Sequence, residues 1–201
     1  MTRPLAALAA CVLLLLPPAR QALEASMSLH MLVQVPLLAA AGAVLAGSLP
    51  ARVRARMDRW NAYGVAGLFA VALAMALLMV PRLLDLAVAD LRVDLAKAAI
   101  LLACGAALRL SWARAGALVQ GFFLGNVLPM MGAVGQVYQD SPLRLCNAYL
   151  LEDQLRLGQG LVAASVAIGA VWFTVLIVRL ARSEAPEGAQ SVDASRRGEL
   201  A

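Results

Sequence analysis

Long apolar runs separated by short charged segments dominate the chain. Five such runs of about twenty residues cover residues 28–49, 62–80, 93–110, 115–137 and 160–180. A helix of this length can cross the hydrocarbon core of a bilayer, and it satisfies its own backbone hydrogen bonds there. The pattern therefore predicts an all-α fold, a polytopic transmembrane helical bundle with five spans.

The first 25 residues form a separate hydrophobic segment. Arg3 precedes a short apolar core, and two consecutive prolines end it. A core of this length is typical of a signal peptide and is shorter than an ordinary span. We expect a signal-like segment over residues 1–25, with cleavage near Ala22 or Ala25. The alternative is retention as a short helix, which leaves the other spans unchanged.

The remainder divides into two parts. Residues 26–182 hold all five predicted spans and form the transmembrane helical domain. Residues 183–201 are polar and rich in small side chains, a composition that buries too little apolar surface to fold. We expect these last residues to form a disordered tail.

Arginines mark one side of the predicted bundle. They concentrate in the loop after the first span, in the loop after the third span and in the tail: Arg52, Arg54, Arg56, Arg59, Arg109, Arg114, Arg179 and Arg182. The intervening loops mix both signs of charge. Loops rich in Lys and Arg stay in the cytoplasm. We expect a multi-pass protein of the bacterial inner membrane with a cytoplasmic C-terminus.

Composition narrows the function classes. The chain is 62% hydrophobic and 14% charged, with a mean hydropathy of +0.80, whereas water-soluble domains carry about a quarter charged residues. The net charge of +5 does not indicate nucleic-acid binding, because no basic face with interleaved aromatics is present. No P-loop, HExxH or GxSxG motif is present either. We expect a non-enzymatic protein whose main partner is the lipid bilayer.

One face of the first span carries candidate metal ligands. Met27, His30, Met31 and Gln34 follow the spacing i, i+3, i+4 and i+7, which places them together at the outer end of a helix. His30 is the only histidine in the chain. Thioether and imidazole groups suit copper, above all Cu(I). The alternative is packing, since methionine commonly fills helix interfaces.

A copper site on this face needs a donor from a neighbouring helix. Met79, near the outer end of the second span, and Met130, in the outer half of the fourth, are the candidates. The sequence thus predicts a weak copper site formed by Met27, His30, Met31, Met79 and Met130.

Two charges fall inside a predicted span. Asp94 and Lys97 lie three residues apart near the outer start of the third span. Charges at membrane depth are costly and often functional. In the first helical turn, however, they can pair with each other or extend to the interface. Both interpretations stay open.

The outer segment over residues 140–159 is the most structured loop. Its apolar positions follow helical spacing, which predicts a short helix lying on the membrane surface. Cys146 lies in it, either as a further copper ligand or as a buried inert thiol. The three cysteines of the chain form no CxxC motif.

Two stretches resemble a known family. The first is SMSLHMLVQVPLL over residues 26–38. The second contains Tyr138, the pair Asp153 and Gln154, and then Gly158 and Gly160 at the start of the last span. Together they resemble the CtaG-like membrane family of cytochrome c oxidase assembly factors.

The chain also departs from that family. Gln34 stands where members usually have a second histidine, and members usually have more spans. The resemblance implies a membrane assembly or copper-handling factor for a respiratory cytochrome c oxidase. Its partners would be an oxidase subunit or a periplasmic copper carrier. The alternatives are a small membrane transporter or permease subunit, or the anchoring subunit of a membrane redox complex.

Overall fold

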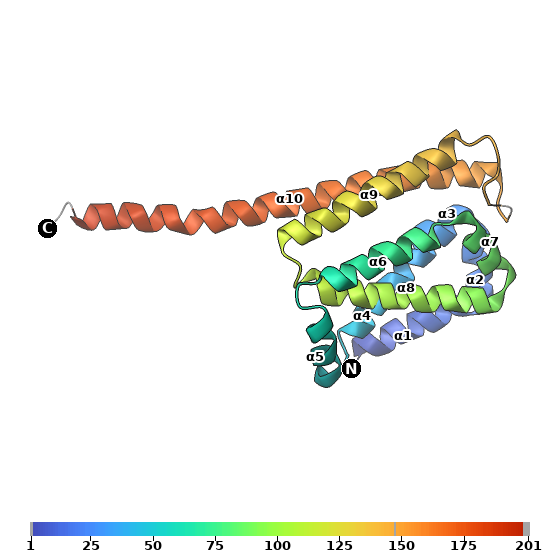
Figure 1. The fold of residues 1–201 in the computed structure, drawn as a ribbon, viewed down its shortest axis with the longest axis horizontal. Coiled ribbons are helices and arrows are strands. Elements are labelled where there is room, and N and C mark those ends of the chain that lie inside the picture. The colour runs from blue at the N-terminus through green and yellow to red at the C-terminus, as the bar shows by residue number, and fades with distance from the viewer. Residues whose placement is uncertain (1, 147, 199–201) are drawn as a thin grey trace.

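The computed structural model describes residues 2–146 and 148–198, and over these residues it is helical without strands. This confirms the all-α prediction. The elements, labelled in Figure 1, are α1 (Thr2–Leu15), α2 (Pro17–Glu24), α3 (Met27–Leu29), the π-helical turn η1 (His30–Gln34), α4 (Val35–Ala46), α5 (Ala51–Trp60), α6 (Val65–Leu78), α7 (Pro81–Ala89), α8 (Leu91–Trp112), α9 (Ala117–Asp140) and α10 (Leu151–Gly198).

The longer helices run alongside one another between two ends of a bundle. Figure 1 shows α1, α4, α6, α8, α9 and α10 arranged in this way. The short helix α5 lies at one end, here called the α5 end. The short helices α2 and α7, and the loop 141–150, lie at the opposite end, here called the α2 end.

Three segments are long and apolar enough to cross a membrane: Met27–Ala46, Ala117–Asp140 and Leu151–Arg182. Two bent pairs raise the number to five if each counts as one span. These are Pro4–Leu15 with Pro17–Glu24, bent by 68°, and Ala51–Trp60 with Val65–Leu78, bent by 85°. The membrane assignment therefore rests on three to five candidate spans, and the predicted span over 93–110 is not among them. That helix, α8, carries Asp94 and Lys97, which lower its hydropathy.

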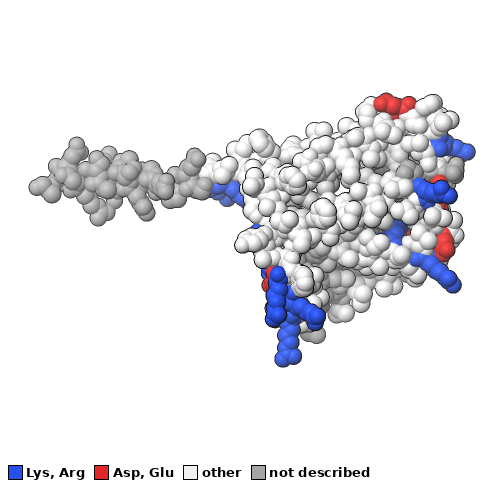
Figure 2. Space-filling view, in the orientation of Figure 1, with Lys and Arg blue, Asp and Glu red and all other residues white. Residues whose placement is uncertain are grey.

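Charge is distributed as a membrane protein requires. In Figure 2 the charged side chains gather at the two ends of the bundle, and the belt between them is almost free of charge. Arginines dominate around α5, whereas both signs occur at the α2 end. Large apolar side chains on the belt are exposed, as at Phe122 and Val166. Exposed apolar surface of this extent is stable against lipid and unstable against water.

Glycines allow the central helices to approach closely. A Cβ atom on Gly42 of α4 would collide with the backbone of Leu102 in α8, and one on Gly105 of α8 would collide with the carbonyl group of Ala39. Small residues at such contacts drive helix association in membranes, where apolar burial gives no net gain. The α4–α8 pair is therefore the closely packed centre of the bundle.

The signal-like segment is part of this packing. Leu14 and Leu15 of α1 pack against a buried apolar cluster of Leu38, Ala98 and Leu101. The chain then bends by 68° into α2 at the two prolines. We expected residues 183–201 to form a disordered tail. Their side chains are outside the part of the chain that the structure describes.

The predicted surface helix within residues 140–159 is wrong for its first part. Among the described residues, the segment between α9 and α10 contains bends and one turn but no helix, and α10 begins at Leu151. Pro142 lacks a backbone donor, and the side chain of Gln154 bonds the backbone of this loop instead.

Candidate functional site

Four charged side chains form a buried network at the α2 end. Lys97 Nζ lies 2.7 Å from Asp94 Oδ1, and Arg20 Nε lies 3.0 Å from Asp94 Oδ2. Arg20 Nε also lies 3.1 Å from Glu24 Oε2, and Lys97 Nζ lies 3.9 Å from Glu24 Oε1. Asp94 is 1% exposed and Lys97 7%. Two positive and two negative groups cancel, which is how charges away from water avoid the full desolvation penalty.

His30 joins this network to the outer loop. Lys97 Nζ lies 2.8 Å from His30 Nε2, and the hydroxyl of Tyr149 lies 2.7 Å from His30 Nδ1. An ammonium group has only donors, so Nε2 accepts from Lys97. The ring proton then sits on Nδ1 and is donated to Tyr149. Both nitrogens of this fully buried ring are engaged.

The π-helical turn also buries a second polar side chain, Gln34. Gln34 is fully buried, and neither its amide oxygen nor its amide nitrogen has a hydrogen-bond partner among the described residues. It lies four residues after His30, at the end of η1. Turns of this kind occur frequently at functional sites. Of the helical face that spacing predicted, Met27, His30 and Gln34 are therefore buried, and Met31 is half-buried.

Sulfur-containing side chains gather near His30 at the α2 end. Met27 and Cys146 are buried in one cluster with Tyr138 and Tyr149, and three further methionines pack against it: Met31, Met79 and Met131. They come from α3, η1, the end of α6, α9 and the loop 141–150. We call this set, Met27, Met31, Met79, Met131 and Cys146, the sulfur cluster. The methionine of α9 packed there is Met131, the neighbour of the predicted Met130.

Cys146 is a protonated thiol in this environment. It is 1% exposed, and burial raises the pKa of the thiol to about 11. The hydroxyl of Tyr138 lies beside it. Burial likewise raises the pKa of Tyr149. At neutral pH both groups are uncharged, so Cys146 is a poor ligand unless a metal displaces its proton.

The pair at the start of α10 holds the outer loop. The Gln154 side chain accepts from Leu145 N at 2.8 Å and donates to the carbonyl oxygens of Tyr138, at 3.1 Å, and Leu143, at 3.3 Å. Asp153 accepts a hydrogen bond from Ser26 Oγ at 3.4 Å. Gln154 is buried, so its role in this structure is to tie the loop 141–150 to α9 and α10.

Three participants were missed by sequence reasoning: Arg20, Glu24 and Tyr149. The first two belong to the segment expected to be cleaved. Their opposite charges lie four residues apart, a spacing that favours pairing on one helix face and could have marked α2 as structural. Tyr149 lies far from His30 in sequence, and no local pattern indicates that contact.

The donor set limits which metal can bind. Among the described residues, no group of three or more histidine, cysteine, aspartate or glutamate side chains is arranged to hold a metal ion. The sulfur cluster offers mainly thioethers, which are soft ligands suited to Cu(I). A comparison of the chain with protein-family models, with curated proteins and with solved structures found no match.

Proposed function

We propose that this chain is a non-enzymatic membrane protein that handles copper during assembly of a respiratory cytochrome c oxidase. The observation that carries the proposal is the sulfur cluster at the α2 end. Methionines from separate helices pack against one buried cluster there, and thioethers bind Cu(I). The α2 end lies opposite the arginine-rich end, so the positive-inside rule assigns it to the periplasmic side.

The hydrogen bonds of His30 modify the proposed ligand set. Copper can use His30 Nε2 only if Lys97 releases it. The thioethers need no such exchange, because a thioether is at most a weak hydrogen-bond acceptor. The proposed site therefore starts from Met27, Met31 and Met79, with Met131 in place of Met130.

The residues that carry the family resemblance lie at the same end of the molecule as the sulfur cluster. His30, Tyr138 and Gln154, which carry that resemblance, lie around the sulfur cluster although they are far apart in sequence. Residues that resemble an assembly-factor family thus surround the proposed copper ligands. The partner would be an oxidase subunit or a periplasmic copper carrier.

Copper binding by the purified protein tests the ligand set. We expect Cu(I) to bind under reducing conditions, and Met31→Leu or Met131→Leu to weaken binding at least tenfold, equivalent to about 1.4 kcal/mol. Met130→Leu is the matched control, because this neighbouring methionine is not among the residues packed on the cluster. Absence of copper in the wild type, or equal effects of Met130→Leu and Met131→Leu, would show that the methionines of the sulfur cluster serve only in packing.

Oxidase activity in cells tests the role. Deletion of the gene should lower copper-oxidase activity at limiting copper without lowering oxidase transcription. Excess copper should partly restore activity, since mass action compensates for a lost weak carrier. Normal activity in the deletion strain at limiting copper would reject the assembly function and favour the transporter alternative.

A further inference from the structure

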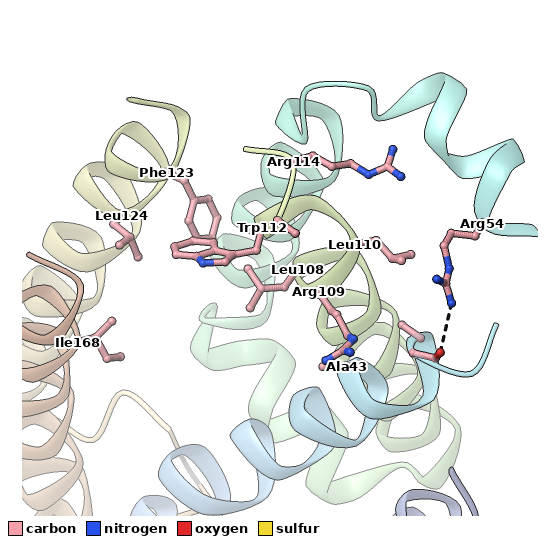
Figure 3. Close-up of a pocket in the computed structure, with 13 residues that line it drawn as sticks. Ala43, Arg54, Leu108, Arg109, Leu110, Trp112, Arg114, Phe123, Leu124 and Ile168 are labelled. Atoms are coloured by element: carbon pink, nitrogen blue, oxygen red, sulfur yellow. Dashed lines mark hydrogen bonds between the residues drawn. The ribbon is translucent and has the colours of Figure 1, made fainter. Parts of the chain in front are cut away.

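A separate groove lies at the α5 end, remote from the sulfur cluster. It has a volume of about 820 Å³ and is formed by the ends of α4 and α8 together with parts of α5, α9 and α10. Figure 3 shows its lining, with arginines on one side and large apolar side chains on the other. Ile168 in the wall is 46% exposed, so the groove opens onto the surface of the bundle.

Among the described residues, no carboxylate pairs with Arg54 or Arg109, two of the arginines that line this groove. Arg114 is paired with Asp58. Arg54 donates to the carbonyl oxygens of Gly47, at 3.2 Å, and Leu49, at 3.4 Å, and so has no carboxylate partner there. Within the described part of the chain, Arg109 forms no ion pair. Two guanidinium groups therefore remain for an anion.

The position of Arg109 suits contact with a headgroup. Its guanidinium lies against Gly47 at the end of α4, where a Cβ atom would be 3.4 Å from Nη2. Figure 3 shows Arg109 and Arg54 reaching the same region near α4 from two different helices. Guanidinium groups bind phosphate through paired, charge-assisted hydrogen bonds.

The opposite wall suits an acyl chain. Trp112 and Phe123 pack edge to face with ring centroids 6.4 Å apart, and Leu124 and Ile168 continue the apolar surface. Within a bilayer an acyl chain gains little by exchanging lipid contacts for protein contacts. Selection between lipids at this groove must therefore come from the headgroup and the arginines.

We propose that this groove binds an anionic phospholipid, with its phosphate between Arg109 and Arg54 and one acyl chain along Trp112 and Phe123. Basic pockets between membrane helices bind anionic headgroups in this manner. The lipid connects the ends of α4, α8 and α9. This site is independent of the proposed copper function, because it uses none of the same residues.

The test measures lipid retained by the full-length protein. The purified chain is equilibrated in mixed micelles with dioleoyl phosphatidylglycerol or dioleoyl phosphatidylcholine, and bound lipid is counted by native mass spectrometry. We expect at least a fivefold preference for phosphatidylglycerol. Arg109→Gln should lower its retention about fivefold, the effect of roughly one basic residue near anionic lipid, and Arg109→Lys should restore part of it.

Two variants and one competitor make the result specific. Arg52→Gln is the matched control, because this exposed arginine of α5 does not line the groove. It should leave retention unchanged. Ala43→Phe fills the groove and leaves the arginines in place, and it should reduce retention as strongly as Arg109→Gln. Inorganic phosphate at millimolar concentration should not compete.

Four outcomes would overturn the proposal. Equal retention of the two lipids excludes headgroup selection. Equal effects of Arg52→Gln and Arg109→Gln indicate only general attraction to anionic lipid. Retention unaffected by Ala43→Phe excludes the acyl chain from the groove. Competition by inorganic phosphate indicates a site for free anions. Unchanged elution of each variant in size-exclusion chromatography shows that the variant is folded.

Discussion

Lys97 illustrates how single residues hold the site. Its ammonium group forms an ion pair with Asp94 and a hydrogen bond with His30 at the same time. Removing one partner of a buried ion pair costs about 3–5 kcal/mol, because the other charge stays buried without compensation. We therefore predict that Lys97→Met strongly lowers the thermal midpoint of the purified protein. The exposed Arg92 of the same helix is the control, and Arg92→Met should have little effect.

The double variant Asp94→Asn, Lys97→Met separates charge from packing. If charge balance is the cause, the double variant should be more stable than Lys97→Met alone. If the loss of stability in the double variant equals the sum of the losses in the two single variants, these residues act independently.

Residue spacing predicted part of this site. Met27, His30 and Gln34 share a buried face, as their i, i+3 and i+7 positions require. Asp94 and Lys97 form an ion pair, one of the arrangements that the sequence left open. The sequence could not decide whether Met130 or Met131 faces the sulfur cluster, because α9 is apolar around most of its circumference. Its rotation is set by its neighbours, and hydrophobic periodicity does not encode that rotation.

At the scale of the helices, glycines allow neighbouring helices to pack closely. In α8, a methyl group on Gly105 has no space beside Ala39, whereas in α9 a methyl group on Gly125 meets nothing within 4 Å. We predict that Gly105→Ala separates α4 from α8 and lowers the stability of the protein by at least about 1–3 kcal/mol. Gly125→Ala should be neutral or slightly stabilising. The measurement is thermal or denaturant unfolding in detergent, and equal stability of the two variants would contradict the close contact between α4 and α8.

The first two helices carry a second prediction at this scale. Leu14 and Leu15 pack on the bundle, and Arg20 and Glu24 belong to the buried network. We therefore expect residues 2–25 to stay attached in the membrane protein, the alternative that the sequence left open. Intact mass measurement of the purified chain checks this. A mature chain that begins after Ala22 or Ala25 would contradict it.

Hydropathy was a partial guide to the elements. It located the helices now seen as α4, α6, α8, α9 and α10, but not the bends. α6 (Val65–Leu78) is only 14 residues long, and the chain bends by 85° between α5 and α6. The arginines of α5 keep α5 at the surface. The outer loop was misread as a helix because its apolar spacing was counted, whereas the hydrogen bonds of Gln154 decide its path.

The whole molecule has two ends of different charge, and this predicts its orientation. A reporter fused after Arg56 or Arg182 should read as cytoplasmic, and one fused near Asp140 as periplasmic, because arginine-rich loops stay inside. Both sets of fusions belong in one experiment, so that each serves as the control for the other. A periplasmic signal from the reporter fused after Arg56 would reverse the predicted topology and place the sulfur cluster on the cytoplasmic side.

The buried network also sets an order of events during synthesis. Chains fold from the N-terminus as they emerge, so His30 waits 67 residues for Lys97 and 119 residues for Tyr149. Arg20 and Glu24 can pair with each other early, whereas Asp94 and Lys97 join them only when α8 is made. The charged network can therefore form once α8 is made, whereas the contact of His30 with Tyr149 forms later. A chain truncated before α8 lacks Asp94 and Lys97 and leaves His30 without either of its hydrogen-bond partners.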